Sequence, residues 1–246
     1  MIDIHCHILP GVDDGAADRE ESLRMGEYAE ACGVTDIIVT PHCNIPGSYG
    51  NYMGKGYDAA ITALRELFKA HGLKLRLHRG MEVFGTDDLV RLIDRDLVIT
   101  LAASRYMLVE FDFDDDMWRV RDVLLALQSR GVTPVIAHPE RYYPVNDDIC
   151  FALDWVDMGC LLQLNRTSIL GLDTSAAERT ALELIRLGAA HFVATDAHGT
   201  RIRCTELSDA YDFLEKRFSK SAAELLTVEN PRRILQNKRI EMRLRH

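Results

Sequence analysis

The chain has 246 residues, of which 47% are hydrophobic and 27% are charged, and its formal net charge is −9 at pH 7. This length is sufficient for one substantial hydrophobic core and is common for a single α/β barrel domain. The acidic charge argues against nucleic-acid binding. Because the sequence contains no apolar run of about twenty residues and no basic, cleavable leader, we expect a cytoplasmic, unsecreted protein without membrane insertion. The six cysteines lack CxxC spacing, so we expect reduced thiols without disulfide bridges.

The first predicted strand, residues 2–8, carries two histidines in the stretch DIHCH. Side chains alternate between the two faces of a strand, so His5 and His7 are expected on one face together with Asp3. A polar face on a buried strand has two explanations: hydrogen-bonded core histidines, or two ligands that bind one metal ion. This stretch alone does not decide between them.

Amphipathic helices and short β-branched strands alternate along the rest of the chain. Helices are predicted over residues 19–33, 117–131, 151–159 and 178–188, and each ends at a glycine that suits the left-handed conformation of a helix C-terminus. Further strands are predicted over residues 34–42, 73–83, 106–113, 132–140, 160–165 and 189–199. About seven strands that are nearly continuous in apolar residues are typical of a parallel sheet covered by helices. We therefore predict one barrel-like α/β domain over residues 1–246, with a doubly wound open sheet as the alternative and a basic C-terminal helix over about 229–246.

Side chains that can bind metals stand at the C-terminal end of each predicted strand. In chain order they are His5 and His7, His42, Glu82, Glu110, His138, Asn165, and Asp196 with His198. In a parallel barrel these strand ends converge on one face. Any single member is explained by an ordinary hydrogen bond, but so many buried carboxylates and imidazoles without a cation would carry a large desolvation cost. The set therefore favours a multinuclear metal site, whereas four other histidines are interpreted as structural or exposed: His71, His78, His191 and His246.

Several long motifs follow one another along the chain: DIHCHILPGVDDG, TPH, RGMEV, LVEF, VIAHPERY and ATDAHG. In these motifs the chain resembles the PHP (polymerase and histidinol phosphatase) superfamily. The longer stretches HCHILPGVDDGAADREES, SRYMLVEF and a late NPRRIL are similar to the CpsB-type bacterial protein-tyrosine phosphatases of capsule and exopolysaccharide loci, from residue 1 to about 237. The resemblance implies a distorted (β/α)7 TIM-like barrel of PHP type and a trinuclear site that holds manganese.

The resemblance also implies how the ligands are shared among three ions. The first ion would be held by His5, His7, Glu82 and Asp196. The second would be held by Glu82 as a bridge, Glu110 and His138. The third would be held by His42, His198 and an acid from VDDG, where Asp14 fits the usual DG ending of the motif and Asp13 is the alternative. Mixed oxygen and imidazole ligands without thiolate favour Mn²⁺, with iron, cobalt or zinc as alternatives.

The chemistry predicted for such a site is hydrolysis of phosphate esters. Cations held close together generate hydroxide at neutral pH, so that a metal-activated hydroxide attacks phosphorus, and they clamp the attacking and leaving oxygens. The resemblance implies phosphate-binding arginines at Arg141 and Arg203, with Arg201 as the alternative to Arg203. These arginines and His42 are the predicted catalytic residues. Because a phenolate leaves more easily than an alkoxide, no general acid is assigned.

The predicted function is therefore that of a metal-dependent phosphotyrosine-protein phosphatase. The resemblance implies that its substrate is the phosphorylated tail of a bacterial tyrosine autokinase that controls polysaccharide synthesis. Hydrolysis of histidinol phosphate is an alternative, which the Gly- and Tyr-rich loop of residues 43–58 does not decide. A third hypothesis is a non-catalytic PHP module that serves in binding. The sequence specifies neither the oligomeric state nor the native metal.

A rival motif lies in CLLQLNRT, residues 160–167, which has the C-x5-R-T spacing of cysteine-dependent tyrosine phosphatases. The phosphate loop of those enzymes needs glycine and free backbone N–H groups. In contrast, CLLQL is an apolar strand whose amides belong to a sheet. Cys160 begins this strand, so it is expected at the end opposite the metals. We therefore predict that the motif is a coincidence.

Overall fold

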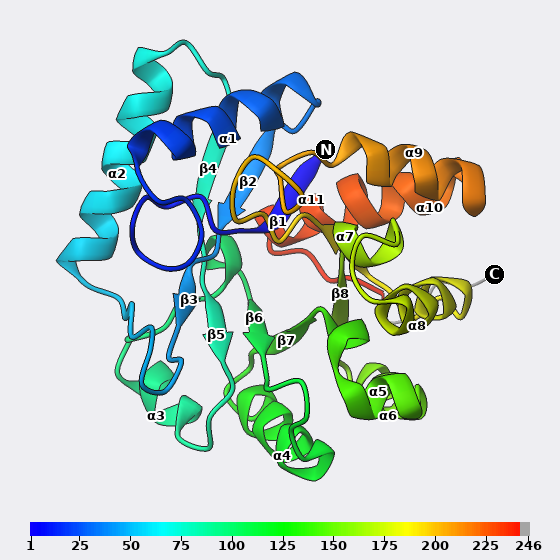
Figure 1. The fold of residues 1–246 in the computed structure, drawn as a ribbon. Helices are drawn as coiled ribbons and strands as arrows, with labels where there is room; N and C mark the ends of the chain where they lie inside the picture. Colours follow the sequence, from blue (N-terminus) through cyan, green and yellow to red (C-terminus); the bar gives the residue numbers. More distant parts are fainter. Residues whose placement is uncertain (242–246) are drawn as a thin grey trace.

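The structure is a computed structural model that describes residues 1–241, and strands and helices alternate along it (Figure 1). The strands are β1 (Ile2–Cys6), β2 (Asp36–Val39), β3 (His42–Cys43), β4 (Arg76–Arg79), β5 (Glu82–Phe84), β6 (Tyr106–Glu110), β7 (Thr133–Ala137), β8 (Leu161–Asn165) and β9 (Phe192–Ala194). The helices are α1 (Arg19–Ala31), α2 (Lys55–Ala70), α3 (Leu89–Asp94), α4 (Met117–Gln128), α5 (Tyr143–Asp147), α6 (Cys150–Asp157), α7 (Arg166–Ile169), α8 (Ser175–Arg186), α9 (Ser208–Arg217), α10 (Lys220–Glu224) and α11 (Asn230–Leu235). Short turns of 3-10 or π type span Leu101–Ala103, Pro139–Arg141 and Leu225–Glu229.

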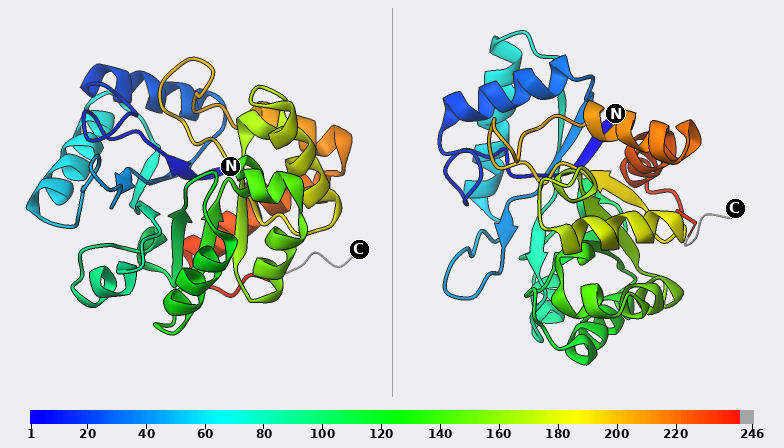
Figure 2. Two further views of the ribbon diagram at one scale, coloured as in Figure 1. Left: turned by 60° about the horizontal axis from the view of Figure 1, so that its bottom comes forward. Right: turned by 45° about the vertical axis from the view of Figure 1, so that its right-hand side comes forward.

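The strands form two parallel sheets, in the orders β1-β2-β4 and β3-β5-β6-β7-β8-β9. The start of the chain joins them, because Cys6 forms a bridge with Ala197 and the backbone N–H of His7 donates to the carbonyl of Ala197 at 2.9 Å. The strands gather in the middle of the molecule and the helices lie outside them (Figures 1 and 2). This arrangement confirms the predicted barrel-like α/β fold over the open-sheet alternative.

Two of the predicted strands are each broken into two short strands. The run 34–42 contains β2 and the start of β3, which are separated at Thr40 and Pro41, and the run 73–83 contains β4 and most of β5, which are separated at Gly80 and Met81. Proline has no N–H to donate to a ladder. At Gly80 a Cβ atom would lie 2.7 Å from Ile38 Cγ2, so the backbone approaches its neighbour too closely for a side chain. Beyond the breaks, the strands realign in a new ladder that begins with His42 opposite Glu82.

Apolar side chains fill the barrel below these polar strand ends. A smaller core includes Leu108, Val135, Leu161 and Phe192, and a larger one lies between the strands and the outer helices. Leu108 shares a face of β6 with Glu110, two residues further along the strand. The four glycines expected to end helices all have positive φ, at Gly33, Gly131, Gly159 and Gly188. The packed core therefore fills the interior below the polar side chains at the C-terminal ends of the strands.

The C-terminal helix is shorter than the predicted span of 229–246. Helix α11 ends at Leu235, and Asn237 has a φ of +48°, which does not continue a right-handed helix. The segment that follows contacts β6, since the Tyr106 hydroxyl donates to the carbonyl of Lys238. Residues 242–246, including His246, lie outside the described part of the chain. No helix within residues 1–241 is both long and apolar enough to cross a membrane.

Candidate metal centre

The structure brings all nine predicted metal ligands together at the C-terminal ends of the strands. They form four overlapping groups in which the ligand atoms lie within 4.8 Å of one another. These groups are His7, Asp14, His42 and His198; His5, His7 and Asp196; His5, Glu82 and His138; and His42, Glu82 and Glu110. Because several residues belong to two groups, the side chains form one continuous cluster.

Glu82 lies at the centre of the cluster and is fully buried. Its Oε1 atom lies 3.2 Å from His5 Nε2 and 3.1 Å from His138 Nε2. Its Oε2 atom lies 3.2 Å from His7 Nε2 and 3.0 Å from His42 Nδ1. Each carboxylate oxygen therefore faces two imidazoles, which is the geometry that a carboxylate bridging two ions would need.

Several buried atoms of the cluster have no hydrogen-bond partner among the described residues: His42 Nδ1, Glu82 Oε2, Glu110 Oε1, Asp196 Oδ1 and His198 Nε2. His42 Nδ1 lies 2.9 Å from Glu110 Oε1, yet the two groups are not aligned as a hydrogen bond. An unpaired buried polar group costs about 1–3 kcal/mol, so such groups are rare in proteins. A divalent cation would satisfy these imidazole and carboxylate atoms together, and the residues present fit that role.

The electrostatics of the cluster also favour positive charge. Burial and the neighbouring charge of Glu82 raise the pKa of Glu110. Burial opposes protonation of His42, but the carboxylates of Glu82 and Glu110 outweigh it and raise the pKa of His42 to about 10. These carboxylates therefore attract a cation or, failing that, protons.

The two acids of VDDG have different surroundings. Asp13 is bonded on both oxygens: Oδ2 lies 2.8 Å from His7 Nδ1 and accepts from the backbone N–H of His42, and Oδ1 accepts from Gly15. Asp14 is half exposed, and its Oδ1 lies 3.4 Å from His42 Nε2 and 3.3 Å from His198 Nε2. This geometry favours Asp14 as the ligand and Asp13 as the residue that orients His7.

A row of amides behind the cluster was missed by the sequence reasoning. Gln163 Oε1 accepts from His5 Nδ1 at 2.8 Å, and Gln163 Nε2 donates to Asn165 Oδ1 at 2.9 Å. Asn165 Nδ2 then donates to Asp196 Oδ2 at 2.7 Å. The sequence pattern identifies Asn165 at the end of a predicted strand but does not identify Gln163. The spacing QLN was the available signal, because residues two apart in a strand share a face.

Two of the candidate ligands lie on strained backbone. His138 has a φ of +35° and Asp196 a φ of +49°, in the left-handed region that non-glycine residues seldom adopt. Such strain collects at functional sites, where the surrounding structure maintains it. Here it turns each side chain sharply at the end of its strand.

Arg141 lies beside the cluster, in the turn after β7. Its Nε atom lies 3.2 Å from Asp173 Oδ2, and its guanidinium carbon lies 4.7 Å from the centre of the Phe113 ring. Its Nη1 atom lies 3.9 Å from Asp196 Oδ2. Arg141 is therefore held from two sides with one end directed toward the cluster. Neither Asp173 nor Phe113 had been predicted as part of the site.

The second arginine of the site is Arg203. Its Nη2 atom lies 2.8 Å from Asp196 Oδ2, and its Nε donates to the carbonyl of Asp196. Arg201 is exposed. Of the two predicted alternatives, Arg203 is therefore the one that reaches the cluster.

Asp3 does not join the cluster, although it was expected on the face of His5 and His7. Its carboxylate accepts hydrogen bonds from the backbone N–H and the hydroxyl of Thr195. The register of β1 shifts between Asp3 and Cys6, which interrupts the simple alternation of side chains.

The histidines interpreted as structural lie elsewhere. His71 contacts the carbonyl of Leu67, and His191 Nδ1 accepts from the backbone N–H of Leu162. His78 Nε2 lies 2.8 Å from the carboxylate of Asp36. These contacts account for the three side chains without a ligand role.

The rival Cys160 motif is not a phosphate loop. Cys160 is fully buried before β8, and burial raises the pKa of its thiol to about 12. Arg166 follows the other end of β8, where its guanidinium pairs with Asp209 and donates to the carbonyl of Ile202. The thiol lies at the end of β8 away from the metal ligands, as predicted, and the whole strand separates it from the guanidinium.

Comparison with known proteins identifies the family to which the chain belongs. Over residues 1–236 the sequence matches the family described as capsular polysaccharide synthesis, CpsB/CapC. The chain belongs to the CpsB/CapC family. The resemblance to CpsB-type proteins that the motifs indicated is thereby confirmed.

Relatives in the CpsB/CapC family match nearly end to end. Tyrosine-protein phosphatase YwqE of Bacillus subtilis (strain 168) is 33% identical over 240 residues, which cover 98% of this chain and 93% of YwqE. Tyrosine-protein phosphatase CpsB of Streptococcus pneumoniae is 31% identical over 245 residues, which cover 98% of this chain and 100% of CpsB. A crystal structure from work on YwqE and CpsB as unique metal-dependent tyrosine phosphatases has a TM-score of 0.92 and 32% identity, covering 98% of this chain and 96% of that chain.

Proposed function

We propose that this CpsB/CapC-family protein is a metal-dependent enzyme that hydrolyses phosphotyrosine in proteins. The observation that carries the proposal is the cluster of imidazoles and carboxylates at the strand ends, with buried atoms that have no hydrogen-bond partner among the described residues. A site of this kind needs cations and faces the side of a barrel on which active sites are built. Both YwqE and CpsB are named tyrosine-protein phosphatases.

We further propose that the protein holds three ions and that they are Mn²⁺. The overlapping groups support several ions, because Glu82 belongs to two groups and His42 to two. The four groups consist of histidine and acidic residues, without cysteine. Oxygen and imidazole donors suit Mn²⁺, whereas thiolates would favour zinc.

The protein side chains have separate tasks in the proposed reaction. When bound, the cations would activate water and neutralise the charge of the phosphate. Arg141 and Arg203 would bind phosphoryl oxygens, since a guanidinium offers paired, charge-assisted hydrogen bonds. Asp173 and Phe113 would keep Arg141 in place for this contact. A tyrosine phenolate leaves readily, so no side chain is assigned as general acid.

The proposed substrate is the phosphorylated tail of a bacterial tyrosine autokinase, acted on in the cytoplasm. The support is the family description, which is capsular polysaccharide synthesis. An exposed peptide tail can approach a site at the open end of a barrel, where Asp14 and Arg203 are 50% and 38% exposed.

The test is a paired assay of the purified protein with Mn²⁺ against a phosphotyrosyl peptide and against histidinol phosphate. We expect a much higher kcat/KM for the peptide, complete loss of activity with a chelator and recovery when Mn²⁺ is restored. A higher kcat/KM for histidinol phosphate would replace the proposed substrate by a small phosphate ester. Absence of hydrolysis of both compounds would favour a non-catalytic module.

A further inference from the structure

Aromatic side chains lie next to the metal-binding cluster, and Tyr49 and Phe113 contact residues of the site. The Tyr49 ring is parallel to the His42 ring, with an angle of 7° and a distance of 5.8 Å between their centres. One face of Phe113 is covered by the Arg141 guanidinium, and its ring meets that of His138 at 90°. Tyr49 and Phe113 therefore support side chains that the proposed reaction uses.

Another aromatic residue near the cluster, Phe84, has no such contact among the described residues. It lies on β5 two positions beyond Glu82, and side chains two positions apart share a face of the strand. In the ladder it is opposite Glu110 on β6. The side chain is partly exposed and packs into neither hydrophobic core of the described chain. Phe84 is thus an apolar ring that stands next to the central carboxylates and is left available to a ligand.

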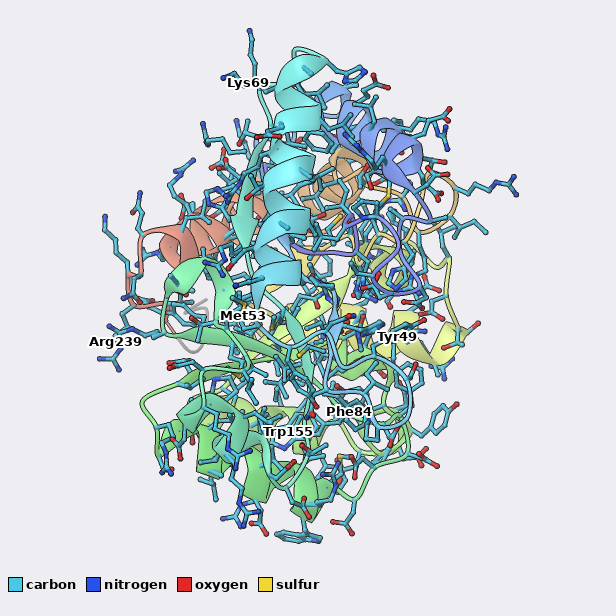
Figure 3. The ribbon with its side chains drawn as sticks, turned by 90° about the vertical axis from the view of Figure 1, so that its left-hand side faces the viewer. Tyr49, Met53, Lys69, Phe84, Trp155 and Arg239 are labelled. Carbon is cyan, nitrogen blue, oxygen red and sulfur yellow. The ribbon has the colours of Figure 1, made fainter. Side chains whose placement is uncertain are left out.

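Hydrogen bonds connect the loop after β3, which carries Tyr49, to β5 at Phe84. Asn44 Nδ2 donates to the carbonyl of Phe84 at 2.9 Å, and the backbone N–H of Asn44 donates to the carbonyl of Gly50. The N–H of Ile45 donates to the carbonyl of Tyr49 at 2.9 Å, which closes the loop on itself. Figure 3 labels Tyr49 and Phe84 in the same part of the view. Hydrogen bonds therefore join the loop and β5 into one connected unit next to the cluster.

The geometry points to Phe84 as the side chain that packs against the phenyl ring of phosphotyrosine and so selects aromatic phosphate esters. This inference rests on the proposed function, in which the phosphoryl group is bound by the ions that Glu82 and Glu110 would hold and by the two arginines. From there the ester oxygen and ring must extend toward the open end of the barrel. Strand β5 runs in that direction, and two residues of a strand span roughly 6–7 Å. A ring joined to phosphorus through one oxygen covers a comparable distance and would lie against Phe84.

The test compares binding of phenylphosphonate with binding of methylphosphonate to the Mn²⁺-loaded protein by calorimetry. Both ligands carry the same anionic group, and only the first has a ring. In Phe84→Ala we expect phenylphosphonate to bind roughly 5- to 30-fold more weakly, as the loss of a ring–ring contact predicts, with methylphosphonate unchanged. Phe84→Leu should lose less, because it keeps apolar area. Trp118→Ala, which removes a 69% exposed aromatic ring from α4, is the matched control and should change neither affinity.

Equal weakening of both phosphonates in Phe84→Ala, or no weakening of either, would overturn the inference. If Phe84→Ala loses metal or fails to fold, Phe84→Leu decides by the same comparison. If the wild type binds neither phosphonate, the inference and the phosphate site both fail. If the wild type binds phenylphosphonate more tightly and Phe84→Ala loses this preference, but the wild type does not hydrolyse phosphotyrosyl peptide, the contact between Phe84 and a ligand ring is supported. Only the proposed substrate then fails.

Discussion

Buried carboxylates at the two ends of the barrel differ in whether all their oxygens have hydrogen-bond partners. At the N-terminal end, Asp36 begins β2 and is buried, but every oxygen has a partner: Arg76 donates to both oxygens at 2.7 and 2.6 Å, and His78 Nε2 lies 2.8 Å from Oδ1. At the C-terminal end, Glu82 and Glu110 are also buried, and each has an oxygen without a hydrogen bond among the described residues.

This difference distinguishes a buried carboxylate that is fully paired within the fold from buried carboxylates that lack partners among the described residues. A buried acid whose partners are supplied by the chain needs no further group, and the fold is destabilised when one member of such a pair is removed. A buried acid whose partners are missing is stable only when something outside the chain supplies them. Replacing Asp36 should therefore affect stability, and replacing Glu82 should affect metal binding and activity.

The largest effect is expected for Glu82→Gln. The amide keeps the shape of the side chain but removes the charge that faces four imidazoles, so at least one ion should be lost. We expect kcat/KM on a phosphotyrosyl peptide to fall roughly 1000-fold or more. Metal analysis of the purified variant measures the cause directly. Full metal content in Glu82→Gln would show that the carboxylate does not bridge ions.

A smaller loss of activity is expected when the arginines are changed one at a time. Arg141→Ala and Arg203→Ala should each remove about 2–4 kcal/mol of transition-state stabilisation, a fall of roughly 30- to 1000-fold in kcat/KM. Arg201→Ala is the matched control, since Arg201 is exposed, and should cost much less. Arg141→Lys should rescue only in part, because an ammonium cannot reproduce the fork. Equal, small losses at Arg141 and Arg203, with normal metal content, would mean that the ions alone hold the phosphate.

Asp36→Asn should act on stability instead of on activity. Loss of the charged hydrogen bonds should lower the free energy of unfolding by about 1–3 kcal/mol. Denaturant unfolding measures this change, and kcat/KM should remain within a few-fold of wild type. If Asp36→Asn had normal stability but impaired catalysis, the assignment of Asp36 to stability and of Glu82 to metal binding would be wrong.

The pH dependence of the same variant has a definite sign. Burial opposes ionisation of Asp36, but hydrogen bonds from His78 and Arg76 outweigh it and hold the pKa well below its usual range. The carboxylate therefore contributes stability above its unfolded pKa of about 3.9, and this contribution is lost as the pH falls further. We expect the wild type to exceed Asp36→Asn in stability at neutral pH and the difference to shrink below about pH 4.

The smallest effect is expected for Cys160→Ser. The thiol is buried at the start of β8, with a pKa raised to about 12, so it supplies no nucleophile at neutral pH. Turnover should stay within a few-fold of wild type, apart from any packing defect. Mass spectrometry of protein quenched during turnover should find no phosphate on this cysteine. A phosphocysteine at position 160 would contradict hydrolysis at the metal centre.

Much of the site could be predicted because strand ends are visible in the sequence. Short β-branched runs followed by a histidine or an acid recur along the chain, and parallel strands place their C-terminal ends on one face. This rule identified His138 and Asp196, which lie far apart in the chain and close together in the structure. The strand order and the residues behind the ligands do not follow from the same rule.

The amino-acid sequence by itself determined the alternation of strands and helices and the set of candidate metal-binding side chains, because both depend on local patterns. Only the tertiary structure gave Asp13 and Asp14 their different surroundings, brought Gln163 behind His5, and placed Phe84 opposite Glu110 in the sheet. It also broke the run before His42 at Pro41 and placed His42 opposite Glu82. The physical reason is that hydrogen-bond partners and packing neighbours come from distant segments, so whether a buried polar atom is satisfied is known only once the chain has folded.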